Sequence, residues 1–451
     1  MNTHSSDTDR MPPPDGRAVT GRRPRFASLL LPASILVSFL AASSAPTPLY
    51  ATYARTWHFS PITTTVVFSV YAVAVLLALL VLGRLSDHVG RRPVLLAALA
   101  VQTIAMVVLT TADGVDALLI GRALQGISTG GALGALGAAM LDVDRRRGTV
   151  ANATAPGIGT GTGALLSGLL VQYLPAPTHL IYLVFVGVFV LQGIGVALMP
   201  EATTRKPGAR AALVPRLAMP AGLRGPVLAA APILFAVWAL AGFYGSLGPA
   251  LARQLSGSPS AVVGGLGFFL LAMAGSLSTV ALDHTRPRTV MLLGIAMLVV
   301  AMAGILLAID RSSTVGFCAG TVVAGIGFGA GFQGGIRTVV PLAAPHERAG
   351  VLSVLYLVCY LGMGAPSVIA GISVVHGGGL VGTARAYALF VVLLALAALV
   401  ALLPTSRSAH SATTSGAGPD RSPHTAAGER NNDKCHDVPT RIRACTEAEC
   451  R

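Results

Sequence analysis

The chain has 451 residues, of which 53% are hydrophobic and only 11% are charged, and its formal net charge is +14. A soluble domain carries about 25% charged residues, so this chain has too few to cover a water-facing surface. The basic residues lie in short loops and tails between apolar segments. This is the positive-inside pattern of a membrane protein, and it argues against a nucleic-acid-binding face.

In chain order, the first 26 residues are polar, proline-rich and basic, and we expect a disordered cytoplasmic tail there. The small residues that end the first apolar run imitate a signal-peptide cleavage site, but we interpret the run as a retained first helix because many spans follow. The apolar runs predict twelve membrane helices, at 27–46, 62–83, 93–111, 115–140, 149–172, 180–199, 227–247, 262–282, 289–308, 315–338, 349–375 and 384–403.

The distribution of basic residues predicts the orientation. With both tails and every even-to-odd connection on one side, 27 of the 32 Lys and Arg residues lie on that side. Since basic residues gather in cytoplasmic loops, both ends are predicted to be cytoplasmic, in an inner (plasma) membrane. The basic, proline-containing stretch 201–226 is the expected linker between an N-terminal bundle, 27–200, and a C-terminal bundle, 227–404. We expect no fold in the tail 405–451.

An internal repeat supports two related halves. In the fourth predicted helix Gly121, Gly126 and Gly130 have the same spacing as Gly320, Gly325 and Gly329 in the tenth, at an offset of 199. In the fifth and eleventh helices, Gly159, Gly161 and Gly168 match Gly362, Gly364 and Gly371 at an offset of 203. Glycines allow membrane helices to approach closely, and the sequence leaves open whether these surfaces are static or slide. The helix-packing candidates are Gly126, Gly130, Pro156, Gly157, Gly159, Gly161, Gly325 and Gly329.

The loop after the second helix carries the most specific motif. It reads Gly83-Arg-Leu-Ser-Asp87-His-Val-Gly90-Arg91-Arg92. This resembles the signature loop of the major facilitator superfamily, and the resemblance covers residues 27–404. It implies an all-α membrane fold of twelve helices in two six-helix, pseudo-symmetric bundles. It also implies that this loop stabilises one conformation, so we predict a conformational latch of Gly83, Asp87, Gly90, Arg91, Arg92 and Asp142.

Arg122, followed by Gln125, resembles a second signature found in proton-coupled drug antiporters. An arginine within a span is costly and is a functional candidate by default, although its side chain could also reach a membrane surface. Acidic residues and histidines occur only in loops, tails or helix ends. That distribution weakens the proton-antiport interpretation, because a proton-coupled transporter usually has a titratable carboxylate inside. It favours a neutral or anionic substrate.

Polar and aromatic residues on the expected cavity helices complete the substrate and coupling candidates, which are Arg122, Gln125, Ser43, Tyr71, Trp238, Tyr244, Gln333 and Tyr360. So sparse a set predicts a largely apolar pocket. The cysteines Cys318, Cys359, Cys435, Cys445 and Cys450 have neither a disulfide pattern nor zinc-site spacing, and no metal or cofactor is expected.

These features together predict a secondary transporter that exports a small organic molecule by alternating access, with proton coupling left open. The alternatives are an uncoupled sugar or metabolite facilitator and, from a different class, a non-transporting membrane sensor. We expect no enzyme, because no catalytic constellation lies in the apolar segments. A monomer in the lipid bilayer, with no nucleic-acid partner, is expected.

Overall fold

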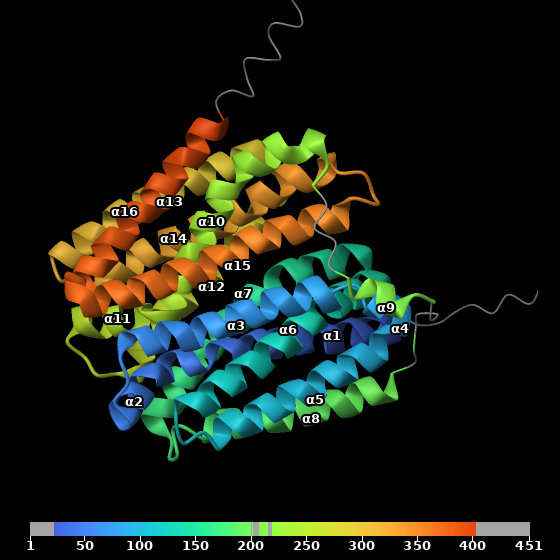
Figure 1. Cartoon of the computed structure of the whole chain (residues 1–451), viewed down its shortest axis with the longest axis horizontal. Coiled ribbons are helices and arrows are strands. Elements are labelled where there is room, and N and C mark those ends of the chain that lie inside the picture. The colour runs from blue at the N-terminus through green and yellow to red at the C-terminus, as the bar shows by residue number, and fades with distance from the viewer. Residues whose placement is uncertain (1–21, 200, 202–206, 215–218, 403–451) are drawn as a thin grey trace, which may run out of the picture. The chain divides into compact units, whose positions relative to one another are not determined.

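The structure is a computed structural model that describes residues 22–199, 201, 207–214 and 219–402 (Figure 1). The predicted tail 405–451, with Cys435, Cys445 and Cys450, lies outside the described residues, as do residues 1–21 and parts of the linker. The first helix begins at Arg22, which is five residues earlier than the sequence predicts.

Every regular element of the described residues is helical. The first half contains α1 (Arg22–Ser44), α2 (Pro46–Trp57), α3 (Pro61–Leu82), α4 (Ser86–Val89), α5 (Arg91–Thr110), α6 (Val115–Val143), α7 (Arg145–Tyr173) and α8 (Leu180–Leu198). The described linker residues form the single turns α9 (Ala209–Ala212) and η1 (Ala221–Leu223).

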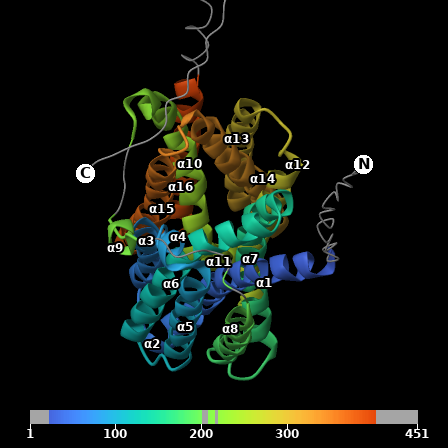
Figure 2. The ribbon, with the colours of Figure 1, turned by 90° about the vertical axis from the view of Figure 1, so that its right-hand side faces the viewer.

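The second half contains α10 (Arg224–Ser246), α11 (Gly248–Ser256), α12 (Ala261–Ala281), α13 (Pro287–Asp310), α14 (Thr314–Val339), η2 (Val340–Leu342), α15 (Arg348–Ser373), η3 (Val374–Gly378) and α16 (Gly379–Leu402). The last helix therefore begins five residues before its predicted start. Figure 2 shows the same ribbon from the side.

Twelve of the described helices have 19 residues or more. Ten segments of the described chain are long and apolar enough to cross a membrane, and the last of them, Arg348–Leu402, contains both α15 and α16. The α7 helix is not among them; its first turn carries three consecutive arginines. The exact number of membrane crossings stays a prediction.

Local sequence explains where several helices begin. Pro61 and Pro287 stand at the first positions of α3 and α13, where a missing N–H costs nothing. The side chains of Asp144, Ser260 and Ser313 cap α7, α12 and α14 by accepting a hydrogen bond from a backbone N–H of the first turn. These ends are therefore set by short-range chemistry that the sequence alone contains.

Helix packing repeats between the two halves. In the first half α6 packs on α3 and α5, and α7 packs on α1. In the second half α14 packs on α12 and α13, and α15 packs on α10. Across the halves, α7 meets α12 and α15 meets α3. The all-α fold with two related halves is thus confirmed, whereas the predicted domain boundaries stay predictions.

The repeated glycines occupy matching places in this packing. Gly126 and Gly130 of α6 face α3, and their counterparts Gly325 and Gly329 of α14 face α12. In α7, Gly159 and Gly163 lie against α1, whereas Gly161 and Gly168 lie against α12 of the other half. One helix therefore uses one glycine face within its half and another face between the halves.

The buried apolar side chains divide in the same way. One cluster is formed by residues between Leu29 and Val196, and a second by Ala164 and residues between Leu223 and Leu402. A smaller third cluster joins Phe68 and Tyr71 of α3 to Tyr360 and Met363 of α15. This third cluster lies where the two halves meet.

Two predicted helices are each followed directly by a further helix, after a break that contains proline. The first predicted helix ends at residue 46, but the chain turns at Ala45 and goes on as α2 to Trp57. The seventh likewise continues past Leu247 as α11. Pro46, Pro48 and Pro249 lack the N–H that a continuous helix would use, so each break leaves backbone carbonyls without a helical donor.

Candidate functional site

Arg122 is buried in the first half, in the early part of α6. Only 1% of the residue is exposed, so its side chain does not reach a membrane surface. Its Nη1 donates to the carbonyl of Ser43, 2.8 Å away, and to the side-chain oxygen of Gln125. The guanidinium carbon lies 4.3 Å from the centre of the Tyr71 ring. The structure therefore brings together four of the predicted candidates, Arg122, Gln125, Ser43 and Tyr71.

Gln125 also supplies a hydrogen bond that the backbone lacks at the proline break after α1. Pro46 has no N–H to donate to the carbonyl of Ala42, four residues earlier, and the Nε2 of Gln125 donates to that carbonyl over 2.9 Å. The hydroxyl of Ser167 on α7 donates to the carbonyl of Ala45 over 2.6 Å. Because the carbonyl end of a helix carries partial negative charge, it also favours the Arg122 cation. No ion pair of Arg122 with a carboxylate occurs among the described residues.

An aromatic path leads from Arg122 into the second half. Tyr71 and Tyr360 belong to the cluster between the halves. The Tyr360 ring lies 4.8 Å from the Trp238 ring, and Trp238 lies 5.8 Å from Phe332, measured between ring centres. The indole nitrogen of Trp238 is buried without a hydrogen-bond partner in the described structure. Tyr360 and Trp238 thus extend the candidate site across the contact between the halves.

Two other candidates lie apart from this path. The hydroxyl of Tyr244 is 2.6 Å from that of Thr321, and its ring stacks on Phe317 inside the second half. Gln333 donates from Nε2 to the carbonyl of Thr279 over 3.1 Å, which ties α14 to α12. The structure gives both residues packing roles within the second half and no contact with Arg122.

The predicted apolar substrate pocket stays a prediction, because the apolar cavity described next lies apart from the candidate site. A cavity of about 240 Å³ lies between α3, α4, α5 and α6. Its lining is almost wholly apolar and contains none of the eight substrate and coupling candidates: Leu82, Leu85, Val89, Pro93, Val94, Ala97, Ala98, Val101, Ile127, Ser128 and Gly131.

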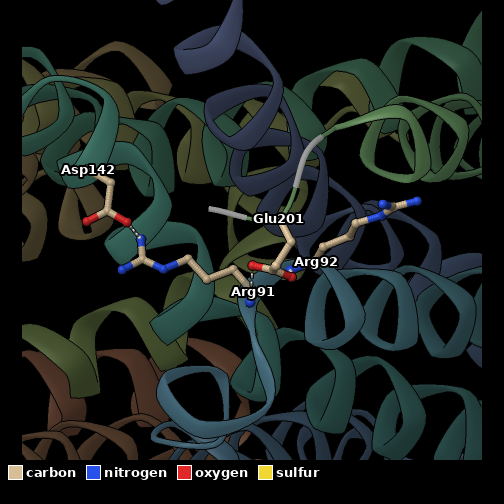
Figure 3. A network of polar contacts seen from close by, with 4 residues as sticks. All are labelled: Arg91, Arg92, Asp142 and Glu201. Atoms are coloured by element: carbon tan, nitrogen blue, oxygen red, sulfur yellow. Dashed lines mark hydrogen bonds and ion pairs between the residues drawn. The ribbon is translucent and has the colours of Figure 1, made fainter. Parts of the chain in front are cut away.

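The signature loop forms a polar network at the start of α5 (Figure 3). Arg91 makes an ion pair with Asp142 at the end of α6, and the side chain of Arg92 points the opposite way. Gly90 precedes α5 with φ = 105°, which favours glycine, and an added Cβ would lie 2.9 Å from a Glu201 oxygen. Of the predicted latch, the structure brings Arg91 and Asp142 together.

Glu201, the first described residue after Met199 at the end of α8, is a member of this network that the sequence analysis missed. Its two carboxylate oxygens accept hydrogen bonds from the backbone N–H groups of Arg91 and Arg92, at 3.2 and 3.0 Å. A carboxylate at a helix N-terminus satisfies unpaired donors and complements the helix dipole. The signal in the sequence was an acidic residue at the end of a span, close to a basic loop.

The linker makes a second attachment to the same loop. The Nδ1 of His88 lies 3.1 Å from the carbonyl of Pro207, and this geometry requires a proton on Nδ1 because a carbonyl only accepts. Residues of α4 also contact α9. The start of the linker is therefore held against the signature loop at Glu201 and at Pro207.

Asp87 takes no part in this network. The residue is exposed on the short helix α4, and no hydrogen bond or ion pair of its carboxylate occurs within the described residues. Gly83, by contrast, packs its backbone against Gly134 of α6. The part of the latch hypothesis that concerns Asp87 stays a prediction.

The hydrogen bonds between the halves are unevenly distributed along the length of the helices. We call the end with α4 and α9 the linker end, and the end with α2 and α11 the far end (Figure 1). Toward the far end, Thr47 donates to the carbonyl of Gly245, and Gln172 accepts from Ser260. Nearer the middle, Ser69 donates to the carbonyl of Gly364 over 3.1 Å. The hydrogen bonds between the halves that the described residues make therefore lie from the far end to the middle.

Three buried tyrosines of the first half were also missed. The hydroxyl of Tyr53 donates to that of Tyr182 over 3.2 Å, and the hydroxyl of Tyr50 is buried without a hydrogen-bond partner in the described structure. Tyr50 and Tyr53 lie on α2, beyond the predicted end of the first helix, so they were not considered as candidates.

Among the described residues, no group of three His, Cys, Asp or Glu side chains is placed to hold a metal ion.

Comparisons with known proteins agree with the fold. The sequence profile described as Major Facilitator Superfamily matches residues 32–365. Among solved structures, a bacterial homologue of the human lysosomal transporter Spinster, in an inward-facing and unoccupied conformation, aligns with a TM-score of 0.69 and 15% identity, over 84% of this chain and 97% of that one. A point mutant of the nucleoside transporter NupG aligns with a TM-score of 0.65 and 14% identity, over 84% and 99% of the two chains.

Curated relatives match over shorter segments. The tetracycline resistance protein, class C, of Escherichia coli is 39% identical over 110 residues, which are 23% of this chain and 27% of that protein. An uncharacterized transporter of Rickettsia bellii (strain RML369-C) is 38% identical over 74 residues, 16% of this chain and 18% of that protein. The matched segments thus span about a quarter or less of these relatives.

Proposed function

Because the chain belongs to the Major Facilitator Superfamily, and is therefore a multi-pass membrane transporter and not an enzyme, we propose that it exports a small organic molecule by alternating access. The transported molecule is neutral or anionic. The linker end faces the cytoplasm of a cell whose inner membrane holds the protein, and both chain ends lie on that side. The basic residues of the linker-end loops support this orientation.

The observation that carries the proposal is the position of Arg122. A buried guanidinium is costly, and here the backbone carbonyl of Ser43, the Gln125 amide and the Tyr71 ring offset that cost, with no carboxylate partner among the described residues. A cationic substrate would be repelled by this charge, whereas a neutral or anionic one would not. The aromatic path through Tyr360 and Trp238 supplies apolar surface for such a molecule.

Alternating access is supported by the uneven distribution of hydrogen bonds between the halves. Hydrogen bonds join the halves near the far end, at Thr47 with Gly245 and at Gln172 with Ser260. This arrangement corresponds to closure on the far side, and the Spinster homologue with a similar fold is described as inward-facing. In our proposal the signature loop, with Arg91 and Asp142, acts as the latch that changes partners when the far end opens.

The direction of transport rests on the curated relative. A resistance protein that is a membrane transporter protects a cell by moving the compound outward, and the partial likeness to the tetracycline resistance protein favours export here. The sequence leaves open whether transport is coupled to proton exchange or is uncoupled facilitation. The experiment below separates the two.

The test is transport by the purified full chain in proteoliposomes. A panel of neutral, anionic and cationic organic compounds is assayed with and without a pH gradient, in wild-type and Arg122→Gln vesicles. We expect transport of a neutral or anionic compound that falls in the variant. Transport restricted to cations would overturn the substrate class, and no transport of any class would overturn the function. A rate that follows the gradient identifies proton exchange, and a rate that ignores it identifies facilitation.

A further inference from the structure

The break between α10 and α11 leaves a buried backbone carbonyl without a helical donor. In a continuous helix the N–H of residue 249 would donate to the carbonyl of Gly245, but residue 249 is proline. The next N–H groups, of Ala250 and Leu251, both donate to the carbonyl of Leu247. An unpaired carbonyl in an apolar interior is costly, so the Gly245 carbonyl requires a donor from elsewhere.

That donor comes from the other half. The hydroxyl of Thr47, which lies between Pro46 and Pro48 on α2, donates to the Gly245 carbonyl over 3.2 Å. Thr47 is 2% exposed and Gly245 is also buried, so water does not replace either group in this conformation. The approach depends on glycine, because a Cβ at Gly245 would collide with the ring of Phe68 on α3.

In the first half, the carbonyl that proline leaves unpaired receives its donor from a side chain of the same half. There, Pro46 frees the Ala42 carbonyl, and Gln125 of α6 donates to it. At the repeat offset of 199, the positions of Arg122 and Gln125 correspond to Thr321 and Ala324 of α14. Ala324 has no donor, and the hydroxyl of Thr321 is bonded to Tyr244 and to the carbonyl of Phe317. The second half therefore supplies no equivalent side chain for its own break.

We propose that Thr47 is a positioning residue that holds the far end closed by completing the Pro249 break of the opposite half. When the far end is closed, the Gly245 carbonyl is paired with Thr47. When α2 and α11 separate, the bond is lost and water reaches the carbonyl. This hydrogen bond to a proline-freed acceptor thus adds to the bonds of Ser260 with Gln172 and of Ser69 with Gly364 that join the halves. This role of Thr47 requires only that the halves move apart at the far end, and no particular substrate.

The test measures the far end directly, without substrate. Spin labels are attached to cysteines at the exposed positions Thr56 and Gln254, on α2 and α11, in a full-length background whose five native cysteines are replaced by alanine. Distances between the labels are measured by pulsed electron resonance in lipid nanodiscs. In Thr47→Val, the ratio of long- to short-distance populations should rise about two- to tenfold, the range for loss of one net hydrogen bond. Thr47→Ser keeps the hydroxyl and should retain the wild-type distribution.

A second variant approaches the same bond from its acceptor. Pro249→Ala restores an N–H that pairs with the Gly245 carbonyl inside the helix, so Thr47 loses its distinct role. We expect a shift toward long distances in this variant and little further change in the double variant, because both remove one interaction. An unchanged distribution in Thr47→Val, or additive shifts in the double variant, overturns the proposal. Failure of the transport assay with an intact distance shift would overturn the proposed function alone.

Discussion

The side-chain Nε2 of Gln125 donates to the carbonyl of Ala42, the acceptor that Pro46 leaves unpaired at the end of α1. Gln125 is fully buried, so no water stands in for it. Gln125→Leu should therefore lower the free energy of unfolding by about 1–3 kcal/mol, the cost of an unsatisfied buried group. Thermal unfolding in detergent measures the change. Gln254→Leu, at an exposed position, is the matched control and should change stability by less than about 0.5 kcal/mol.

Arg122→Lys keeps the charge but removes the planar guanidinium, whose Nη1 donates to both Ser43 and Gln125. The stacking over Tyr71 weakens as well. We expect transport to fall about tenfold in proteoliposomes, equal to a loss of about 1.4 kcal/mol in the rate-limiting step. Arg311→Lys, in an exposed loop, should transport at the wild-type rate. Wild-type transport by Arg122→Lys would show that only the charge matters.

Asp87→Asn tests the part of the latch that is unpaired in this conformation. Since Asp87 is exposed and makes no described contact, the substitution should change stability by less than about 0.5 kcal/mol. It should nevertheless reduce transport, if the carboxylate is used when the far end opens, and leave membrane insertion intact. Wild-type transport by the variant would exclude Asp87 from the latch.

Asp142→Asn is the companion measurement, because it breaks the ion pair with Arg91 that the structure contains. The Asp142 side chain is 51% exposed, so the pair should contribute less than about 1 kcal/mol to stability. We expect slower transport with little loss of thermal stability. A large loss of stability with normal transport per folded molecule would make the pair a structural contact.

Gly168 of α7 lies against the first residues of α12 in the other half. A Cβ there would lie 2.8 Å from the Ala261 carbonyl oxygen and 3.1 Å from the Val262 Cα, which are backbone atoms that cannot rotate away. Gly168→Ala should therefore force the far end apart and lengthen the distances between labels at positions 56 and 254. Gly187→Ala on α8 meets nothing within 4 Å and should leave those distances unchanged. Equal behaviour of the two variants would contradict a role for the Gly168 contact.

Much of the fold followed from the sequence because its causes are local. The length of the apolar runs and the position of the basic loops are visible within short stretches of sequence, so the main helices were predicted within a few positions. The glycine offsets also predicted which helices correspond, and Gly126 and Gly325 do meet corresponding partners, α3 and α12. The family resemblance of the loop 83–92 was confirmed by the match over residues 32–365.

Tertiary structure decided what each polar group meets. The sequence placed Arg122 in a span. Only the fold shows that its partner Gln125 donates a hydrogen bond to the carbonyl that Pro46 leaves unpaired. Glu201 and Arg91 are 110 residues apart in the chain, and Thr47 and Gly245 are 198 apart. Such pairs depend on how helices from distant segments pack, and short-range patterns contain no information about that. The same reason separates Tyr244 and Gln333 from Arg122, although all three stood equal as candidates in the sequence.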